Sequence, residues 1–244
     1  MSDPANTVTN RSEIVFLYDA VDANPNGNPL SGANRPRIDP QTRQAIVTDV
    51  RLKRYLRDQL DDDGHGVYIR NVQEDGNQYT RGQLLEDRLK AVEPDDYDLD
   101  DDEEADEFRE DVFGEFLNES VDVRYFGATM SVDTDEVYAK HLPDHFTGPV
   151  QFSPGKSMQY GLIRFHGLVD EHGAADTNLT KADVKRLDTL CWRAIKNQTI
   201  SRSKVGQEPR LYCRVEYADE SFHLGGLDRD LELDDEHSKP DEEL

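Results

Sequence analysis

Cysteine is scarce in this chain of 244 residues, and so are long hydrophobic runs. Cys191 and Cys213 are the only cysteines, and neither lies in a CxxC motif or near a histidine at metal-ligand spacing. We therefore expect two packed, reduced thiols. No window approaches the roughly 18 consecutive apolar residues of a transmembrane helix, and the polar start, MSDPANTVTN, shows no signal peptide. These absences predict a cytoplasmic protein with no membrane contact.

Positive charge is also in short supply, with 28 lysines and arginines against 52 aspartates and glutamates, a net charge of −24. The short acidic side chain dominates, with 33 Asp against 19 Glu, and Arg outnumbers Lys by 19 to 9. This composition is typical of a surface adapted to molar salt, where the Debye length falls to about 3 Å at 1 M. The net charge therefore does not exclude an anionic partner, and segments that stay basic become informative.

Three segments stand out against this acidic background. Residues 35–57 hold seven basic and two acidic residues, residues 146–169 hold no acidic residue, and residues 193–214 hold six basic residues and one acidic one. If the three converge on one face, they form a groove for a phosphate backbone. If they scatter, the chain is an acidic scaffold without nucleic acid. Four aromatic residues either stack on bases in such a groove or pack in the core: Tyr125, Phe126, Phe152 and Tyr160.

The order of apolar patterns predicts an α+β fold. IVFLYDAV (14–21) is typical of a strand buried on both faces, and 48–60 of a helix with a leucine stripe on one side. Strands joined by tight turns are predicted in the acid-free segment, then a helix over 180–197 and a strand over 211–217 that alternates two faces. The order strand, helix, insertion, strands, helix, strand is that of a split β-α-β domain, RRM-like or ferredoxin-like.

Composition also suggests domain limits. The insertion contains a candidate strand at 67–72 and an acidic run at 93–111, which we interpret as a solvated or flexible segment. The predicted divisions are a disordered N-terminus at 1–12, an RRM-like palm at 13–227 with the insertion at about 61–121, and an acidic, disordered tail at 228–244.

Signals for an enzyme are weak. PGKS resembles the end of a phosphate-binding loop, but the upstream glycine of that motif would fall at Val150. His141 and His145 are four residues apart, yet Pro143 between them argues against a shared helical face for a metal. Asp22 is the one candidate for acid–base or metal-assisted cleavage of bound RNA. We therefore predict no catalytic residue, no metal and no cofactor, with Asp22 kept as the alternative.

Several longer motifs resemble one family. In order along about 13–230 they are DANPNGNP, RPRID, VTDVRLKRYLRD, DVRYFGA, TGPVQFSPGKSM and RSKVGQEPRLYCRVEY. They look like the repeated backbone subunit of type I CRISPR Cascade complexes, of the RAMP superfamily, and are similar above all to the type I-B form of haloarchaea. The resemblance implies an RRM-like palm with a helical insertion and extended hairpin or loop insertions.

The resemblance also implies a function and partners. Such subunits assemble with further copies of themselves into a filament along a CRISPR RNA, beside other Cascade subunits, and expose the guide for pairing with target DNA in antiviral defence. A recruited nuclease–helicase cuts the DNA, so the backbone subunit is not an enzyme. Carried onto this sequence, the motifs imply that the guide RNA is bound by Asn24, Asn26, Arg35, Arg37, Lys53, Arg54, Arg57, Gln151, Lys156, Ser157, Arg202 and Lys204.

Two departures from the family pattern bear on this prediction. The loop often reads NPNGDP in relatives, whereas position 28 here is Asn. Related type III backbone subunits cleave target RNA with an acidic residue in this loop, so a metal-dependent endoribonuclease that uses Asp22 remains the alternative function. Family members also continue beyond the LDRDLEL segment, whereas this chain ends in PDEEL, which predicts a truncated sequence or a short variant.

Overall fold

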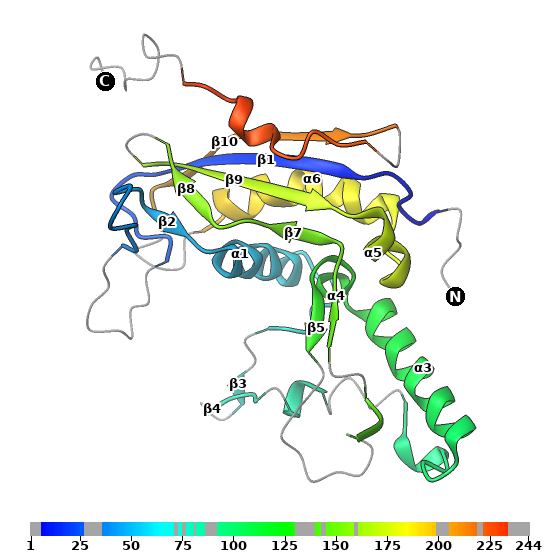
Figure 1. Ribbon diagram of the computed structural model, residues 1–244. Helices are drawn as coiled ribbons and strands as arrows, with labels where there is room; N and C mark the ends of the chain where they lie inside the picture. Colours follow the sequence, from blue (N-terminus) through cyan, green and yellow to red (C-terminus); the bar gives the residue numbers. More distant parts are fainter. Residues whose placement is uncertain are drawn as a thin grey trace.

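The computed structural model is shown in Figure 1. All statements below concern the residues that the structure describes, which are 6–26, 36–70, 73–74, 77–80, 82–85, 92–129, 140–142, 145–158, 161–198, 205–218 and 222–233.

An antiparallel sheet forms the centre of the fold, with strands in the order β10-β1-β9-β8-β2 and with β7 also paired to β9 (Figure 1). β1 and β9 are rich in β-branched and aromatic residues, which favour strands. The bounds are β1 (Ser12–Ala20), β2 (Ile46–Val47), β7 (Val150–Phe152), β8 (Gly155–Ser157), β9 (Leu162–Val169) and β10 (Gln207–Glu216).

Two helices complete the predicted split β-α-β topology. α1 (Asp49–Asp62) follows β1, and α6 (Lys181–Lys196) connects β9 to β10, so each helix joins strands that flank a third strand. Both lie on the same side of the sheet in Figure 1. Thr48 caps α1 by accepting a hydrogen bond from the Arg51 amide, and Thr180 forms a capping box with Asp183. The α+β, ferredoxin-like prediction is confirmed.

The main core lies between the sheet and these helices. Ile14, Phe16 and Tyr18 of β1 point toward it, and the predicted leucine stripe of α1 faces them. α6 buries Leu187, Leu190, Cys191, Ala194 and Ile195 on its inner side, as the sequence predicted. Each fully buried leucine contributes about 1.5–3 kcal/mol, so this stripe holds both helices on the sheet.

A second hydrophobic cluster lies below the sheet in Figure 1, around α3 (Asp102–Glu119) and α4 (Val121–Phe126). It includes Phe108 and Val112 of α3, both with no exposed surface. The acidic run is therefore not only a solvated segment, because part of it forms α3 and buries an apolar stripe. The shorter elements here are β3 (Gln73–Glu74), β4 (Asn77–Gln78), η2 (Pro94–Asp96), β5 (Gly127–Thr129) and β6 (His145–Thr147).

The candidate strand at 67–72 is not a strand over its described residues, 67–70. The amides of Tyr68 and Ile69 donate to the carboxylate of Asp122, at 2.8 and 3.2 Å, instead of to a neighbouring strand. Because a buried carboxylate satisfies these donors, the segment is fixed without a sheet ladder.

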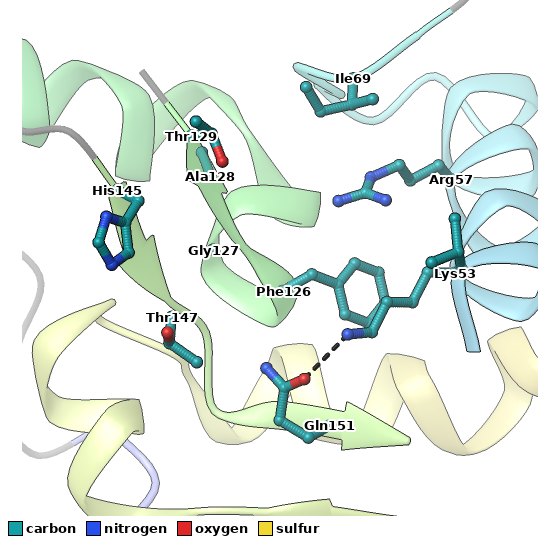
Figure 2. Close-up of a pocket in the computed structure, with 11 residues that line it drawn as sticks. Lys53, Arg57, Ile69, Phe126, Gly127, Ala128, Thr129, His145, Thr147 and Gln151 are labelled. Carbon is teal, nitrogen blue, oxygen red and sulfur yellow. Dashed lines mark hydrogen bonds between the residues drawn. The ribbon is translucent and has the colours of Figure 1, made fainter. Parts of the chain in front are cut away.

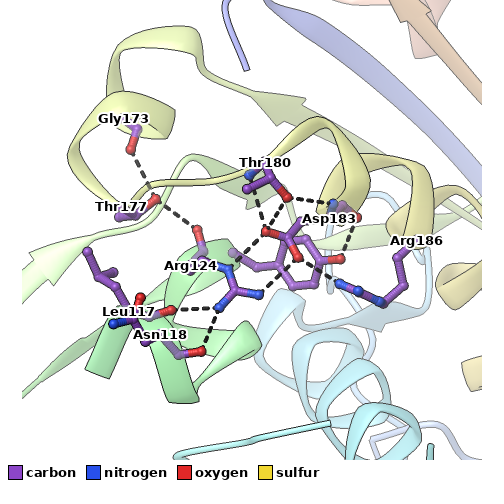
Figure 3. A network of polar contacts seen from close by, with 9 residues as sticks. Leu117, Asn118, Arg124, Gly173, Thr177, Thr180, Asp183 and Arg186 are labelled. Atoms are coloured by element: carbon purple, nitrogen blue, oxygen red, sulfur yellow. Dashed lines mark hydrogen bonds and ion pairs between the residues drawn. The ribbon is translucent and has the colours of Figure 1, made fainter. Parts of the chain in front are cut away.

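A polar network joins the second cluster to the palm (Figure 3). Arg124 of α4 donates to both carboxylate oxygens of Asp183 in α6, at 2.9 and 3.0 Å, and also to the carbonyl of Leu117. Burial alone would raise the pKa of the Asp183 carboxyl, but Arg124 and Thr180 lower it. The bidentate pair therefore ties α4 to the start of α6.

On the opposite face of the sheet, the segment around η4 (Leu227–Asp230), which follows β10, packs against β1 and β9. The short helix α5 (Glu171–Asp176) lies between β9 and α6 in the chain. Glu13 of β1 is fully buried there and accepts hydrogen bonds from the amides of Gly225, Gly226 and Leu227. Desolvation would raise the pKa of this carboxyl, but the donors outweigh it and lower the pKa to about 2. Glu13 therefore anchors the segment as an ionised group.

Cys213 is exposed, so only Cys191 is the packed thiol that the sequence predicted. The cause is a register shift in β10, where Leu17 pairs with Leu211 but Tyr18 pairs with Pro209. The extra residue reverses the alternation, so Tyr212 packs against the core and Cys213 faces solvent. Among the described helices, none is long and apolar enough to cross a bilayer.

Candidate nucleic-acid interface

A cleft of about 490 Å³ opens between the palm and the second cluster (Figure 2). α1 forms one wall, the β5–β6 ribbon forms the other, and Phe126 and Gln151 lie between them. Its lining consists of Val50, Lys53, Arg57, Ile69, Phe126, Gly127, Ala128, Thr129, His145, Thr147 and Gln151. Pockets of about 300–1,000 Å³ are typical of small-molecule sites, so the cleft has room for a unit of nucleotide size.

Lys53 is held in a fixed position on the α1 wall. Its amino group donates to Gln151 Oε1 at 2.9 Å, lies 3.7 Å from a carboxylate oxygen of Asp49, and sits 5.5 Å from the centre of the Phe126 ring. Desolvation lowers the pKa of Lys53, and the nearby Arg57 lowers it further. A phosphate bound beside Lys53 would favour the charged form of its amino group and would pair with it.

Arg57 lies one turn further along α1 and shares the Phe126 ring, with its guanidinium carbon 5.1 Å from the ring centre. Its Nε donates to Asp122 at 2.9 Å. Asp122 is fully buried and also accepts the two backbone amides described above. The contact with Asp122 fixes Arg57 to the segment at Tyr68 and Ile69, and Arg57 also lines the cleft. Figure 2 shows this group and the Lys53 amino group pointing toward the ribbon.

The ribbon wall is polar but carries no carboxylate. Gly127 pairs with Thr147, and Thr129 pairs with His145. Residues directly opposite one another, and residues two apart, share a face of an antiparallel pair. All four positions therefore present the same face, and that face lines the cleft. The two walls differ in kind, since one is cationic and the other offers hydroxyl and imidazole groups.

Of the residues predicted to bind RNA, the cleft brings together Lys53, Arg57 and Gln151. Gln151 acts as a positioning residue, because its Oε1 accepts from Lys53 and its Nε2 donates to the Gly148 carbonyl at 2.7 Å. Arg54 is not among the lining residues. It pairs with Asp58, one turn further along the same helix.

Other predicted residues support the local structure. The Asn26 side chain donates to the Ile46 carbonyl at 2.5 Å and accepts from the Thr48 amide, so it fixes the loop to the start of α1. Ser157 Oγ accepts from the Ala45 amide at 2.9 Å. Asn24 is buried, and Arg37 and Lys156 are exposed outside the cleft. The remaining predictions, Arg35, Arg202 and Lys204, lie outside the described residues.

The third basic segment is occupied by ion pairs over its described part. Arg193 pairs with Asp63, Lys196 with Glu208, Arg210 with Asp19, and Arg214 with Asp188. No residue that lines the cleft comes from this segment. Acidic residues from within the segment, close to it and far from it in the chain therefore balance its positive charge.

The aromatic residues divide between core and cleft. Tyr125 has no exposed surface and Phe152 is 6% exposed, so core packing is the correct interpretation for both. Phe126 is 8% exposed and belongs to the main core, and it also lines the cleft beneath the two cations. Tyr160 lies outside the described residues. The sequence did not predict that Thr129 and Thr147 line the cleft. They do so because β5 pairs with β6, and no local motif indicates a pairing between segments so far apart in the sequence.

Asp22, the residue of the alternative function, is exposed at the end of β1 and does not line the cleft. Its φ of 52° places it in the left-handed region, which is uncommon for a residue other than glycine. Within the described ranges, no group of three or more His, Cys, Asp or Glu side chains is arranged to hold a metal ion.

The chain is similar in sequence to known proteins. The family model "CRISPR-associated protein Cas7" matches residues 10–160 and 156–243. A protein of Haloferax volcanii named CRISPR-associated protein Cas7 is 48% identical over 276 aligned positions, which cover 96% of this chain and 78% of that protein. A chain of a solved CRISPR RNA-guided surveillance complex is 13% identical, with a TM-score of 0.40 and coverage of 84% of this chain and 75% of that chain.

Proposed function

The chain belongs to the Cas7 family of CRISPR-associated proteins, and from that premise we propose that it is a CRISPR RNA-binding backbone subunit of a type I Cascade complex that grips its guide in the cleft beside α1. Base pairing between guide and target supplies the sequence specificity in such complexes, so the protein has to hold phosphate and sugar. The cleft offers groups of this kind in Lys53 and Arg57.

The observation that carries this proposal is the pair of cations over Phe126. Lys53 and Arg57 converge on one cleft, with side chains only 13% and 15% exposed, in a chain of net charge −24. A shielded cleft also retains charge attraction better than an open surface does, because molar salt screens exposed charges within about 3 Å. A halophilic nucleic-acid-binding protein therefore benefits from recessed cations.

The proposal extends to the assembly. The subunit belongs to a multisubunit complex with CRISPR RNA, in which we place further copies of this chain along the guide, other Cascade subunits at its ends, and target DNA paired to the guide. We further propose that the subunit performs no chemical step and that a recruited nuclease–helicase cuts the DNA. Asp22, the residue of the alternative function, lies outside the cleft, and this supports a subunit that performs no chemical step.

The test is the salt dependence of RNA binding. Neutralising one phosphate-contacting residue lowers the slope of log affinity against log salt by about 0.7 for a single strand. We expect Lys53→Met, which keeps the apolar stem, to bind guide RNA more weakly and with a slope reduced by about 0.7. Filter binding or fluorescence anisotropy across a KCl series in which the protein stays folded measures both values.

Lys185→Met is the matched control, because Lys185 is an exposed lysine on α6 and lies outside the cleft. It should leave affinity and slope unchanged. If Lys53→Met behaves like Lys185→Met while both proteins keep the wild-type melting temperature, the cleft is not the guide-binding site.

A further inference from the structure

The ribbon wall of the cleft has a composition that phosphate binding does not require. Thr129 and Thr147 are exposed and share one face of the ribbon, across the cleft from Lys53 and Arg57 in Figure 2. Both threonines line the cleft, and Gly127, opposite Thr147, adds no side chain there. A wall that bound only phosphate would carry further lysine or arginine side chains in place of these hydroxyl groups.

The two walls fit the two polar parts of an RNA strand. The ribbon lies across the cleft from Lys53 and Arg57, so in the proposed binding mode a phosphate on the α1 wall places the adjoining sugar toward the ribbon. A ribose presents a 2′-hydroxyl there that both donates and accepts a hydrogen bond, and a threonine hydroxyl can do the same. Deoxyribose presents only C–H groups at that position.

We propose that Thr129 and Thr147 recognise the 2′-hydroxyl of a guide nucleotide and make the cleft selective for RNA over single-stranded DNA. The inference rests on the proposed function, because it requires the phosphate to be held by the α1 wall. It assigns the two walls different tasks, in which α1 supplies charge attraction to either nucleic acid and the ribbon distinguishes the sugars.

The experiment compares short RNA and DNA strands of one sequence binding to the full chain at a single salt concentration. The double variant Thr129→Val/Thr147→Val keeps the side-chain shape and removes both hydroxyls, and valine is well accepted in strands. A net hydrogen bond of about 1 kcal/mol corresponds to about fivefold in affinity. We expect the double variant to bind RNA about 5- to 25-fold more weakly and to bind DNA unchanged.

Thr189→Val on α6 is the control, because Thr189 is exposed there and its hydroxyl donates to the Arg186 carbonyl of its own helix. It should keep the wild-type ratio of RNA to DNA affinity. An unchanged ratio in the double variant, or an equal loss for RNA and DNA, would overturn the inference. Lys53→Met separates this from the proposed function, since it should weaken both strands. If Lys53→Met weakens both and the double variant leaves the ratio unchanged, only the sugar recognition is wrong.

Discussion

Replacing Arg124 by alanine is expected to lower the free energy of unfolding by about 3–5 kcal/mol, the range found when one partner of a buried ion pair is removed. Asp183 has only 2% of its side chain exposed and would keep Thr180 and Arg186 but lose its bidentate partner. The carbonyl of Leu117, which accepts from Arg124 at 2.6 Å, would also lose its donor. For a chain of this size the melting temperature should fall by about 6–20 °C.

Arg193→Ala provides the comparison. Arg193 also forms a bidentate contact, with Asp63, but half of its side chain is exposed. Exposed pairs contribute about 0–1 kcal/mol, so this variant should melt within a few degrees of the wild type. Thermal unfolding followed by circular dichroism in molar KCl measures both. Equal, small shifts for the two variants would show that the Arg124–Asp183 pair does not hold α4 to α6.

Gly148→Ala is expected to damage the fold and the cleft together. A Cβ at this position would lie 2.3 Å from the Gly127 nitrogen and 2.4 Å from the Tyr125 carbonyl oxygen, both backbone atoms that cannot turn aside. The connection from β6 to β7 must therefore shift away from the end of α4, and it carries Thr147 and Gln151 on either side. Overpacking of this kind costs about 1–3 kcal/mol or more. We expect a lower melting temperature and several-fold weaker RNA binding.

Gly114→Ala separates this clash from a general effect of replacing glycine. Gly114 lies within α3, and a Cβ there would meet no atom within 4 Å. Alanine in a helix interior gains about 0.5–1 kcal/mol over glycine, so this variant should be slightly more stable than the wild type and bind RNA equally well. If Gly148→Ala also melts and binds like the wild type, the ribbon is not fixed against α4 as described.

The palm could be predicted because its signals are local. Thr48 precedes a leucine stripe of helical spacing, and the structure has α1 there with Thr48 as its cap. The uninterrupted apolar run of β1 correctly indicated a central strand, covered on one side by the helices and on the other by the segment near η4. A short apolar run of this kind predicts that its residues are buried, and the central place of β1 in the sheet buries them.

The cleft could be predicted only in part. Lys53 and Arg57 were identified from the helix, but helical spacing alone could not show that Arg54 points toward Asp58 instead. The ribbon wall depends on Thr129 meeting His145 across a long separation in sequence, which no local pattern encodes. The same limit applies to the third basic segment, because two of its balancing carboxylates, Asp63 and Asp19, lie far away in the chain.

The most direct test of the central claim is to map where guide RNA contacts the assembled protein. Guide RNA carrying 4-thiouridine at successive positions can be photo-crosslinked to the full chain, and the linked peptides identified by mass spectrometry. Binding in the cleft predicts crosslinks in the peptides that contain Lys53–Arg57 of α1 and Thr147–Gln151 of β6 and β7. Crosslinks confined to α6 and β10, with the cleft peptides unmodified, would contradict it.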